Sequence, residues 1–171
     1  MWSMPIVPSS LDEIPAADVA SLIQVAAKQY RKIYLVSSGR GAALALMGAQ
    51  LWQARQQTKR IAGAIFLFPN LLASNPEAGE EATYLPITRQ TRLPIALLQG
   101  ELSPWHWQLD TLKQQLAQGG SCVAIKNLSG VRDRFYFRED AFPRERELGD
   151  QLDRLITEAI NHLPAAKRKA P

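Results

Sequence analysis

Four short, continuous apolar runs constrain the fold of this chain more than any other feature of its sequence. Each run is four or five residues long, is partly β-branched or aromatic, and does not alternate with polar residues. The runs are Ile33–Val36, Ala64–Phe68, Ile95–Leu98 and Cys122–Ile125. Such runs are typical of strands that are covered on both faces, as in a parallel sheet.

The stretches between these runs are predicted to be helices, because their apolar residues recur at helical spacing. They cover Pro15–Arg31, Gly41–Arg55, Pro104–Gln118 and Arg144–Leu163. Alternating strands and helices imply right-handed βαβ units. The predicted fold class is therefore α/β, a three-layer, open and mostly parallel sheet with helices on both faces.

One domain, residues 1–164, is predicted to hold this sheet, and residues 165–171 are predicted to be a basic, disordered tail. Residues 70–93 are rich in Pro, Glu and Thr and have no clear period, which indicates a lid-like excursion outside the sheet. Trp2–Val7 is a candidate fifth strand, although its proline restricts it to an edge or an end of the sheet.

Ligands of open α/β sheets bind beyond the carboxyl ends of the strands. Three loops of this chain are predicted to lie there, namely 37–42, 99–105 and 127–134. The first loop runs from a buried strand straight into an Ala-rich helix. Small residues at Ser37 and Gly41 allow the strand and the helix to approach closely.

This strand-to-helix corner resembles the nucleophile elbow of the α/β-hydrolases, which has the pattern G-x-S-x-G. On that pattern, Ser37 occupies the first glycine position, Gly39 the serine position and Gly41 the last glycine position. The central residue of the elbow has a strained backbone conformation that glycine adopts readily. The resemblance implies an elbow that keeps its turn without a nucleophilic hydroxyl.

The other two positions of the family's catalytic triad are also altered. Ser103 stands where the family has its aspartate, and Asp133 lies in the loop that carries the family's histidine. The two histidines, His106 and His162, do not fall where a base would meet the elbow. The resemblance covers roughly residues 2–163 and lacks the N-terminal strands of the fold. We therefore favour a catalytically inactive α/β-hydrolase-like domain, used in binding or protein interaction, over an enzyme.

Two alternatives remain open at this corner. A divergent hydrolase could use Ser37 or Ser38 as a displaced nucleophile. An anion-binding module could be centred on Arg40, because a helix N-terminus favours anions and the guanidinium adds a planar set of donors. Equally, Arg40 could form an ion pair with a loop carboxylate such as Glu101 or Asp133.

The candidate ligand-binding residues lie at the corner and on the two neighbouring loops. They are Ser38, Gly39, Arg40, Gly41, Glu101, Trp105 and Arg132. Aromatic residues near the same rim, among them Trp107 and Phe135, suit a partner interface or cover the sheet edge. No metal site and no cofactor are expected, since the sequence has no ligand cluster and no complete dinucleotide-binding motif.

The composition restricts the remaining possibilities. Hydrophobic residues make up 46% of the chain and charged residues 21%, which is typical of a folded, soluble protein. The formal net charge is +4, but acidic and basic residues mix along most of the chain, so no nucleic-acid binding is predicted. No segment approaches the roughly 20 apolar residues that a membrane span requires. We expect a cytoplasmic rather than periplasmic protein, with a second copy, a fused or separate protein domain, or a small anion as its partner.

Overall fold

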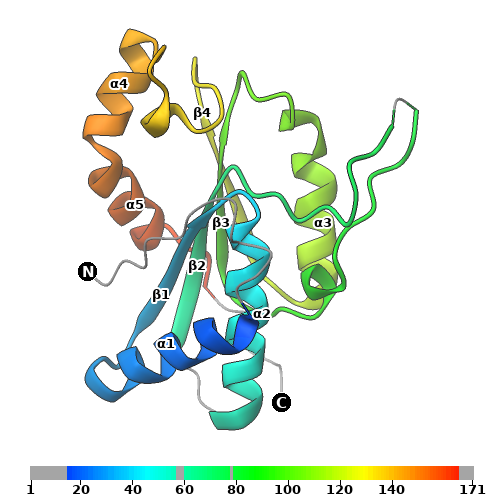
Figure 1. Cartoon of the computed structure of the whole chain (residues 1–171), viewed down its shortest axis with the longest axis vertical. Helices are drawn as coiled ribbons and strands as arrows, with labels where there is room; N and C mark the ends of the chain where they lie inside the picture. Colours follow the sequence, from blue (N-terminus) through cyan, green and yellow to red (C-terminus); the bar gives the residue numbers. More distant parts are fainter. Residues whose placement is uncertain (1–14, 57–59, 78, 166–171) are drawn as a thin grey trace.

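The computed structural model describes residues 15–56, 60–77 and 79–165. Within these residues, four strands form one parallel sheet whose order follows the chain, β1-β2-β3-β4 (Figure 1). The strands are β1 Ile33–Ser38, β2 Ile61–Leu67, β3 Ile95–Gly100 and β4 Val123–Leu128. The predicted α/β fold class is confirmed. The candidate strand at residues 2–7 and most of the predicted tail lie outside the described residues.

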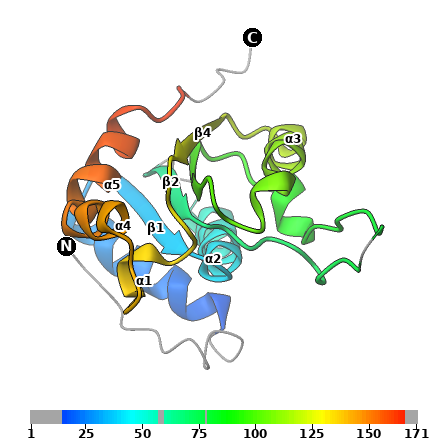
Figure 2. The ribbon, with the colours of Figure 1, turned by 90° about the horizontal axis from the view of Figure 1, so that it is seen from above.

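Helices cover both faces of this sheet. They are α1 Ala16–Gln29, α2 Gly41–Gln56, α3 Leu109–Gly119, α4 Pro143–Asp150 and α5 Leu152–Asn161. Apolar residues of α1, α2 and α3 share one buried cluster with one face of the sheet, and α5 packs in a second cluster with the other face. Figure 2 shows this three-layer arrangement from above.

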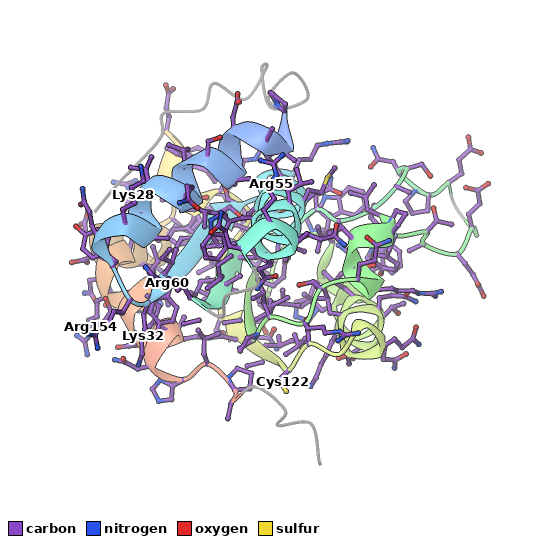
Figure 3. All side chains as sticks on the ribbon, turned by 90° about the horizontal axis from the view of Figure 1, so that it is seen from below. Lys28, Lys32, Arg55, Arg60, Cys122 and Arg154 are labelled. Atoms are coloured by element: carbon purple, nitrogen blue, oxygen red, sulfur yellow. The ribbon has the colours of Figure 1, made fainter. Side chains whose placement is uncertain are left out.

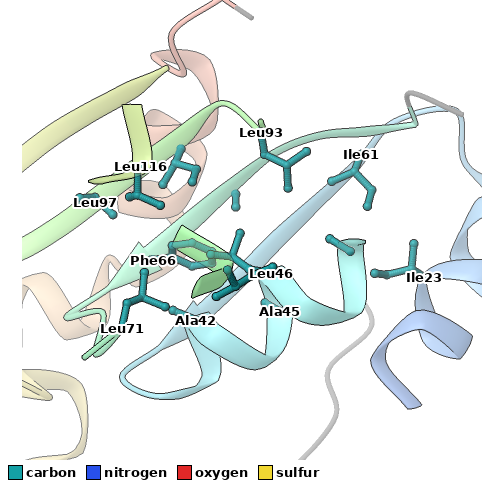
Figure 4. Close-up of a cluster of buried hydrophobic side chains, with 14 of the residues drawn as sticks. Ile23, Ala42, Ala45, Leu46, Ile61, Phe66, Leu71, Leu93, Leu97 and Leu116 are labelled. Carbon is teal, nitrogen blue, oxygen red and sulfur yellow. The ribbon is translucent and has the colours of Figure 1, made fainter. Parts of the chain in front are cut away.

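The two central strands supply both clusters because successive side chains of a strand point to opposite faces. Phe66 of β2 and Leu97 of β3 belong to the cluster under α2 (Figure 4), whereas Ile65 and Leu98 belong to the cluster under α5. All four side chains are fully buried. The outer strand β1 is less covered, and its Val36 is 45% exposed.

Residues 70–93 lie outside the sheet, and part of this segment extends away from the body of the protein (Figure 1). Its ends nevertheless belong to the core, because Leu71, Ile87 and Leu93 are buried in the cluster under α2. An antiparallel bridge between Leu72 and Tyr84 closes the loop at its base. Its role as a lid stays a prediction.

Two helix predictions were wrong in detail. The helix expected from residue 104 begins only at Leu109, because Ser103 and Trp105 form a turn that is followed by a short 3-10 helix, η3 His106–Gln108. The single helix expected over residues 144–163 is divided at Gln151, where φ is −110° and ψ is 23°. The division allows α4 to pack on the loop after β4 while α5 packs on the sheet.

Candidate functional site

The corner between β1 and α2 is a tight turn held against the end of β2. β1 ends at Ser38 and α2 begins at Gly41, so only two residues connect them. The N–H group of Gly39 donates to the carbonyl oxygen of Leu67 at 3.1 Å. The carbonyl oxygen of Gly39 accepts from the N–H group of Asn70 at 3.0 Å. These bonds to both sides of Gly39 fix the apex of the turn.

Gly39 has the backbone conformation for which glycine is best suited. Its φ angle is +54°, in a region that residues with a Cβ rarely adopt. A Cβ atom built on Gly39 would meet no atom within 4 Å, whereas one on Gly41 would lie 3.5 Å from the Cβ of Ser37. The apex therefore faces open space, and the backbone conformation, rather than crowding, accounts for glycine at this position.

Ser103 and Asp133 come from different loops and meet in the structure. Their side chains are hydrogen-bonded to each other. The side-chain amide of Gln99, at the end of β3, donates to Asp133 Oδ1 at 3.0 Å. Gln99 is 1% exposed, and its own Oε1 is buried without a hydrogen-bond partner in the described structure. Two of the three positions that the sequence comparison with the triad pointed to thus lie in one polar cluster at the carboxyl ends of β3 and β4.

Burial raises the pKa of the Asp133 carboxyl above its ordinary value of 3.8, although Ser103, Gln99 and the Arg134 and Arg138 cations oppose the shift. The folded protein therefore holds this proton more tightly than the unfolded chain does. This contribution to stability falls as the pH rises from about 3.8 through the raised pKa.

We expect Asp133→Asn to remove this pH dependence, because the amide is neutral at every pH and has nearly the same shape. The free energy of unfolding of the variant, relative to the wild type, should be higher at pH 7 than at pH 3. Urea denaturation at the two pH values measures the difference. An equal difference at both values would contradict the raised pKa.

Ser38, beside the apex, contacts an aromatic residue and no histidine. Its hydroxyl is hydrogen-bonded to Tyr136, whose pKa is raised by burial. Tyr136 packs on Phe135 and Phe68, with ring centroids 5.2 Å and 6.4 Å away. A phenol with a raised pKa is a poor general base near neutral pH, since it stays protonated. The described surroundings of Ser38 thus lack the activation that a serine nucleophile requires.

Glu101 and Arg132, two of the candidate ligand-binding residues, are occupied within the protein. The carboxylate of Glu101 accepts from Ser129 Oγ at 2.7 Å and from the N–H group of Gly130 at 3.1 Å, which lowers its pKa. The guanidinium of Arg132 donates to Glu145 at 2.7 Å and 2.9 Å. Glu101 therefore fastens the loop after β4, and Arg132 fastens α4.

The structure does not bring the remaining candidate residues together around one ligand position. Arg40 is exposed at the turn, Gly41 opens α2, and Trp105 is half-buried at the start of the η3 turn. His106 lies in η3, near enough to lower the pKa of Glu101. His162 follows α5 and its ring contacts the carbonyl oxygen of Glu158. Among the described residues, neither histidine is hydrogen-bonded to a serine hydroxyl.

Sequence reasoning did not single out two residues of this region, Gln99 and Glu145. Gln99 carries a usable signal, because it is a polar residue that directly extends a buried apolar run. Tyr136 was expected as one of several rim aromatics, but nothing in the sequence indicated its hydrogen bond with Ser38. Glu145 is one of many charged residues around α4, so it carries no signal of its own.

Comparison with known proteins gives matches at the level of three-dimensional structure only. No protein-family model and no curated protein matches the chain. The fold is similar to esterase 2 of Thermogutta terrifontis, which was solved as the form phosphoramylated by tabun. The identity is 18% and the TM-score 0.55, and the match covers 86% of this chain and 65% of the esterase. It is also similar to the hyperthermophilic esterase of the archaeon Pyrobaculum calidifontis, with 15% identity, a TM-score of 0.63, and coverages of 91% and 63%. A third match is carboxyl esterase 2 of the fungus Tuber melanosporum, with 13% identity, a TM-score of 0.57, and coverages of 84% and 59%.

The parallel sheet, the sharp corner after β1 and these similarities define a protein with the α/β-hydrolase fold. This chain spans less than two thirds of the length of the three esterases. In residues 15–56, 60–77 and 79–165, no group of three or more His, Cys, Asp or Glu side chains could hold a metal ion. No helix of the same residues is long and apolar enough to cross a membrane.

Proposed function

We propose that this chain is a catalytically inactive α/β-hydrolase-like domain that acts by binding a ligand or another protein. The observation that carries the proposal is the identity and geometry of the apex. Gly39 has a φ angle of +54° and faces open space, yet it has no side chain that could attack a substrate. Nucleophilic catalysis requires an activated side chain at the reacting position.

The cluster of Ser103 and Asp133 supports the same proposal. In a working triad, an acid orients a histidine and the histidine removes the proton of the nucleophile. Here Asp133 is bonded to Ser103 and to Gln99, so its carboxyl group is used within the cluster. With no histidine among its partners, the cluster offers no relay to a nucleophile.

Reaction with a fluorophosphonate probe tests the proposal directly. The Thermogutta terrifontis esterase 2 is phosphoramylated by tabun in its structure, so a protein of similar fold can carry an organophosphorus adduct. We expect the present chain to form no adduct, as measured by intact-protein mass spectrometry beside an active esterase as positive control. An adduct on Ser37 or Ser38 would refute the proposal and support the alternative of a divergent hydrolase with a displaced nucleophile.

Gly39→Ser should restore a hydroxyl at the apex without restoring activity. The new side chain has space, but the positive φ angle should lower the free energy of unfolding by about 1–3 kcal/mol. Gly39→Ala is the matched control, because it carries the same backbone strain without the hydroxyl. We expect both variants to lose similar stability in urea denaturation and neither to hydrolyse p-nitrophenyl acetate above the wild-type rate. Serine-dependent turnover in Gly39→Ser alone would show that a base is present after all.

The anion-binding alternative centred on Arg40 is favoured by one local observation. The first turn of α2 carries no acidic residue, and Arg40 is exposed directly before it. A helix N-terminus of this kind favours a carboxylate or phosphate group. A titration with inorganic phosphate tests this alternative, since Arg40→Gln should abolish binding if the anion lies at the corner.

A further inference from the structure

The charges of this chain are unevenly distributed along its sequence. No acidic residue occurs between Asp18 and Glu77. The same stretch contains seven basic residues, which are Lys28, Arg31, Lys32, Arg40, Arg55, Lys59 and Arg60. This stretch includes most of α1 and all of β1, α2 and β2, so this part of the fold has basic side chains and no acidic ones.

A cavity of about 240 Å³ lies within this basic region, away from the corner at Gly39. Its lining residues come from the second half of α1, the last part of α2 and the residue before β2. They are Gln24, Ala27, Lys28, Trp52, Gln56 and Arg60. The cavity thus lies where β1 and β2 begin, while the corner lies where β1 ends. Figure 3 looks onto this end of the molecule, with Lys28 and Arg60 labelled.

The polar groups around this cavity are mainly hydrogen-bond donors. Trp52 Nε1–H donates to Gln24 Oε1 at 2.8 Å, which uses the amide oxygen of Gln24 and leaves its NH₂ group to donate elsewhere. Arg60 donates through Nη1 to the carbonyl oxygen of Ala27, and its other N–H groups remain as donors. Lys28 adds an ammonium group that has no carboxylate within 4 Å among the described residues.

The ends of helices α1 and α2 supply only part of the compensating negative charge. Each helix C-terminus carries roughly half a negative charge, and the bond from Arg60 to Ala27 satisfies one terminal carbonyl of α1. Lys28 and Arg60 together carry two full positive charges at the cavity. Arg31 and Lys32, both exposed, add two more where β1 begins. The net local charge is therefore positive.

We propose that this cavity binds a small oxyanion, namely a phosphate or carboxylate group of a soluble ligand. Lys28 and Arg60 would hold the charge, and the amides of Gln24 and Gln56 would donate to the remaining oxygens. The site is separate from the one at Arg40, since the two lie at opposite ends of β1. It requires neither catalysis nor a ligand at the corner.

The test is to titrate the full chain with inorganic phosphate, pyrophosphate and citrate at constant ionic strength. Isothermal titration calorimetry measures binding, and thermal unfolding measures the change in Tm. Saturable binding and an increase in Tm are expected for at least one of these anions, with sodium chloride giving neither. Lys28→Gln should weaken binding by about tenfold, because it removes one charge-assisted hydrogen bond. Arg60→Gln should weaken it as well, but this variant also loses the bond to Ala27, so Lys28→Gln is the decisive variant.

Two further variants separate the possible outcomes. Lys113→Gln makes the same change of net charge on α3, outside the cavity lining, and should leave the affinity unchanged. Arg40→Gln should also leave it unchanged. The proposal is overturned if no anion binds saturably, or if Lys28→Gln and Lys113→Gln behave alike. Loss of binding in Arg40→Gln alone would overturn it too and would place the anion at the corner.

Discussion

Replacing Glu145 with glutamine is expected to lower the free energy of unfolding by about 3 kcal/mol, one of the two largest effects that we predict. Glu145 is 0% exposed, and its carboxylate accepts four hydrogen bonds. Two come from the Arg132 guanidinium, and the others come from the N–H groups of Arg132 and Phe142 at 2.8 Å each. A glutamine has only one acceptor oxygen, and its NH₂ group would face N–H donors that now bond to the second carboxylate oxygen.

Glu145 should also make the free energy of unfolding depend on pH in the acidic range. Hydrogen bonding to Arg132 holds the pKa of Glu145 at about 2, well below its ordinary value of 4.5. A lowered carboxyl pKa stabilises the folded state above the ordinary pKa, and this stabilisation is lost as the pH falls from about 4.5 to about 2. Urea denaturation between pH 7 and pH 2.5 should show this loss in the wild type and a smaller loss in Glu145→Gln.

Glu147→Gln is the matched control for this experiment. Glu147 pairs with Arg144 across one turn of α4, and both side chains are more than half exposed. The control should change the free energy of unfolding by less than about 0.5 kcal/mol. If the two variants lost the same stability, the buried carboxylate would not be what fastens α4 to the loop after β4.

Replacing Gly100 with alanine should destabilise the protein by a similar amount, about 3 kcal/mol. A Cβ atom at this position would lie 2.3 Å from the carbonyl oxygen of Val131 and 3.0 Å from its carbon. Both are backbone atoms, so no side-chain rotation relieves the clash. The backbones cannot separate easily either, because the N–H group of Leu102 donates to the same oxygen at 3.0 Å.

Gly149→Ala provides a control with the opposite sign. Its Cβ atom would lie 3.7 Å and 3.9 Å from Tyr136, which is ordinary van der Waals contact, and Gly149 lies within α4. Alanine should therefore raise the free energy of unfolding by about 0.5–1 kcal/mol. Unchanged stability in Gly100→Ala would contradict the close approach of the two loops.

Much of this fold could be predicted from local sequence patterns. The continuous apolar runs located the strands, because a strand buried on both faces needs apolar residues at every position. The small residues at Ser37, Gly39 and Gly41 indicated a tight corner, and the structure has a two-residue turn with a positive φ angle at Gly39. Boundaries were less predictable, as the division of the last helix at Gln151 shows, because packing partners outside the helix decide where it bends.

The sequence by itself thus determined the fold class, the positions of the strands and the glycine at the apex of the corner, all of which depend on residues near one another in the chain. Only the tertiary structure decided that Ser103 meets Asp133, that Glu145 is buried beneath Arg132, and that donors surround one cavity. Each of these arrangements joins residues from separate elements. Their partners are set by how the elements pack, and local hydrophobic patterns carry no record of which polar side chains will meet.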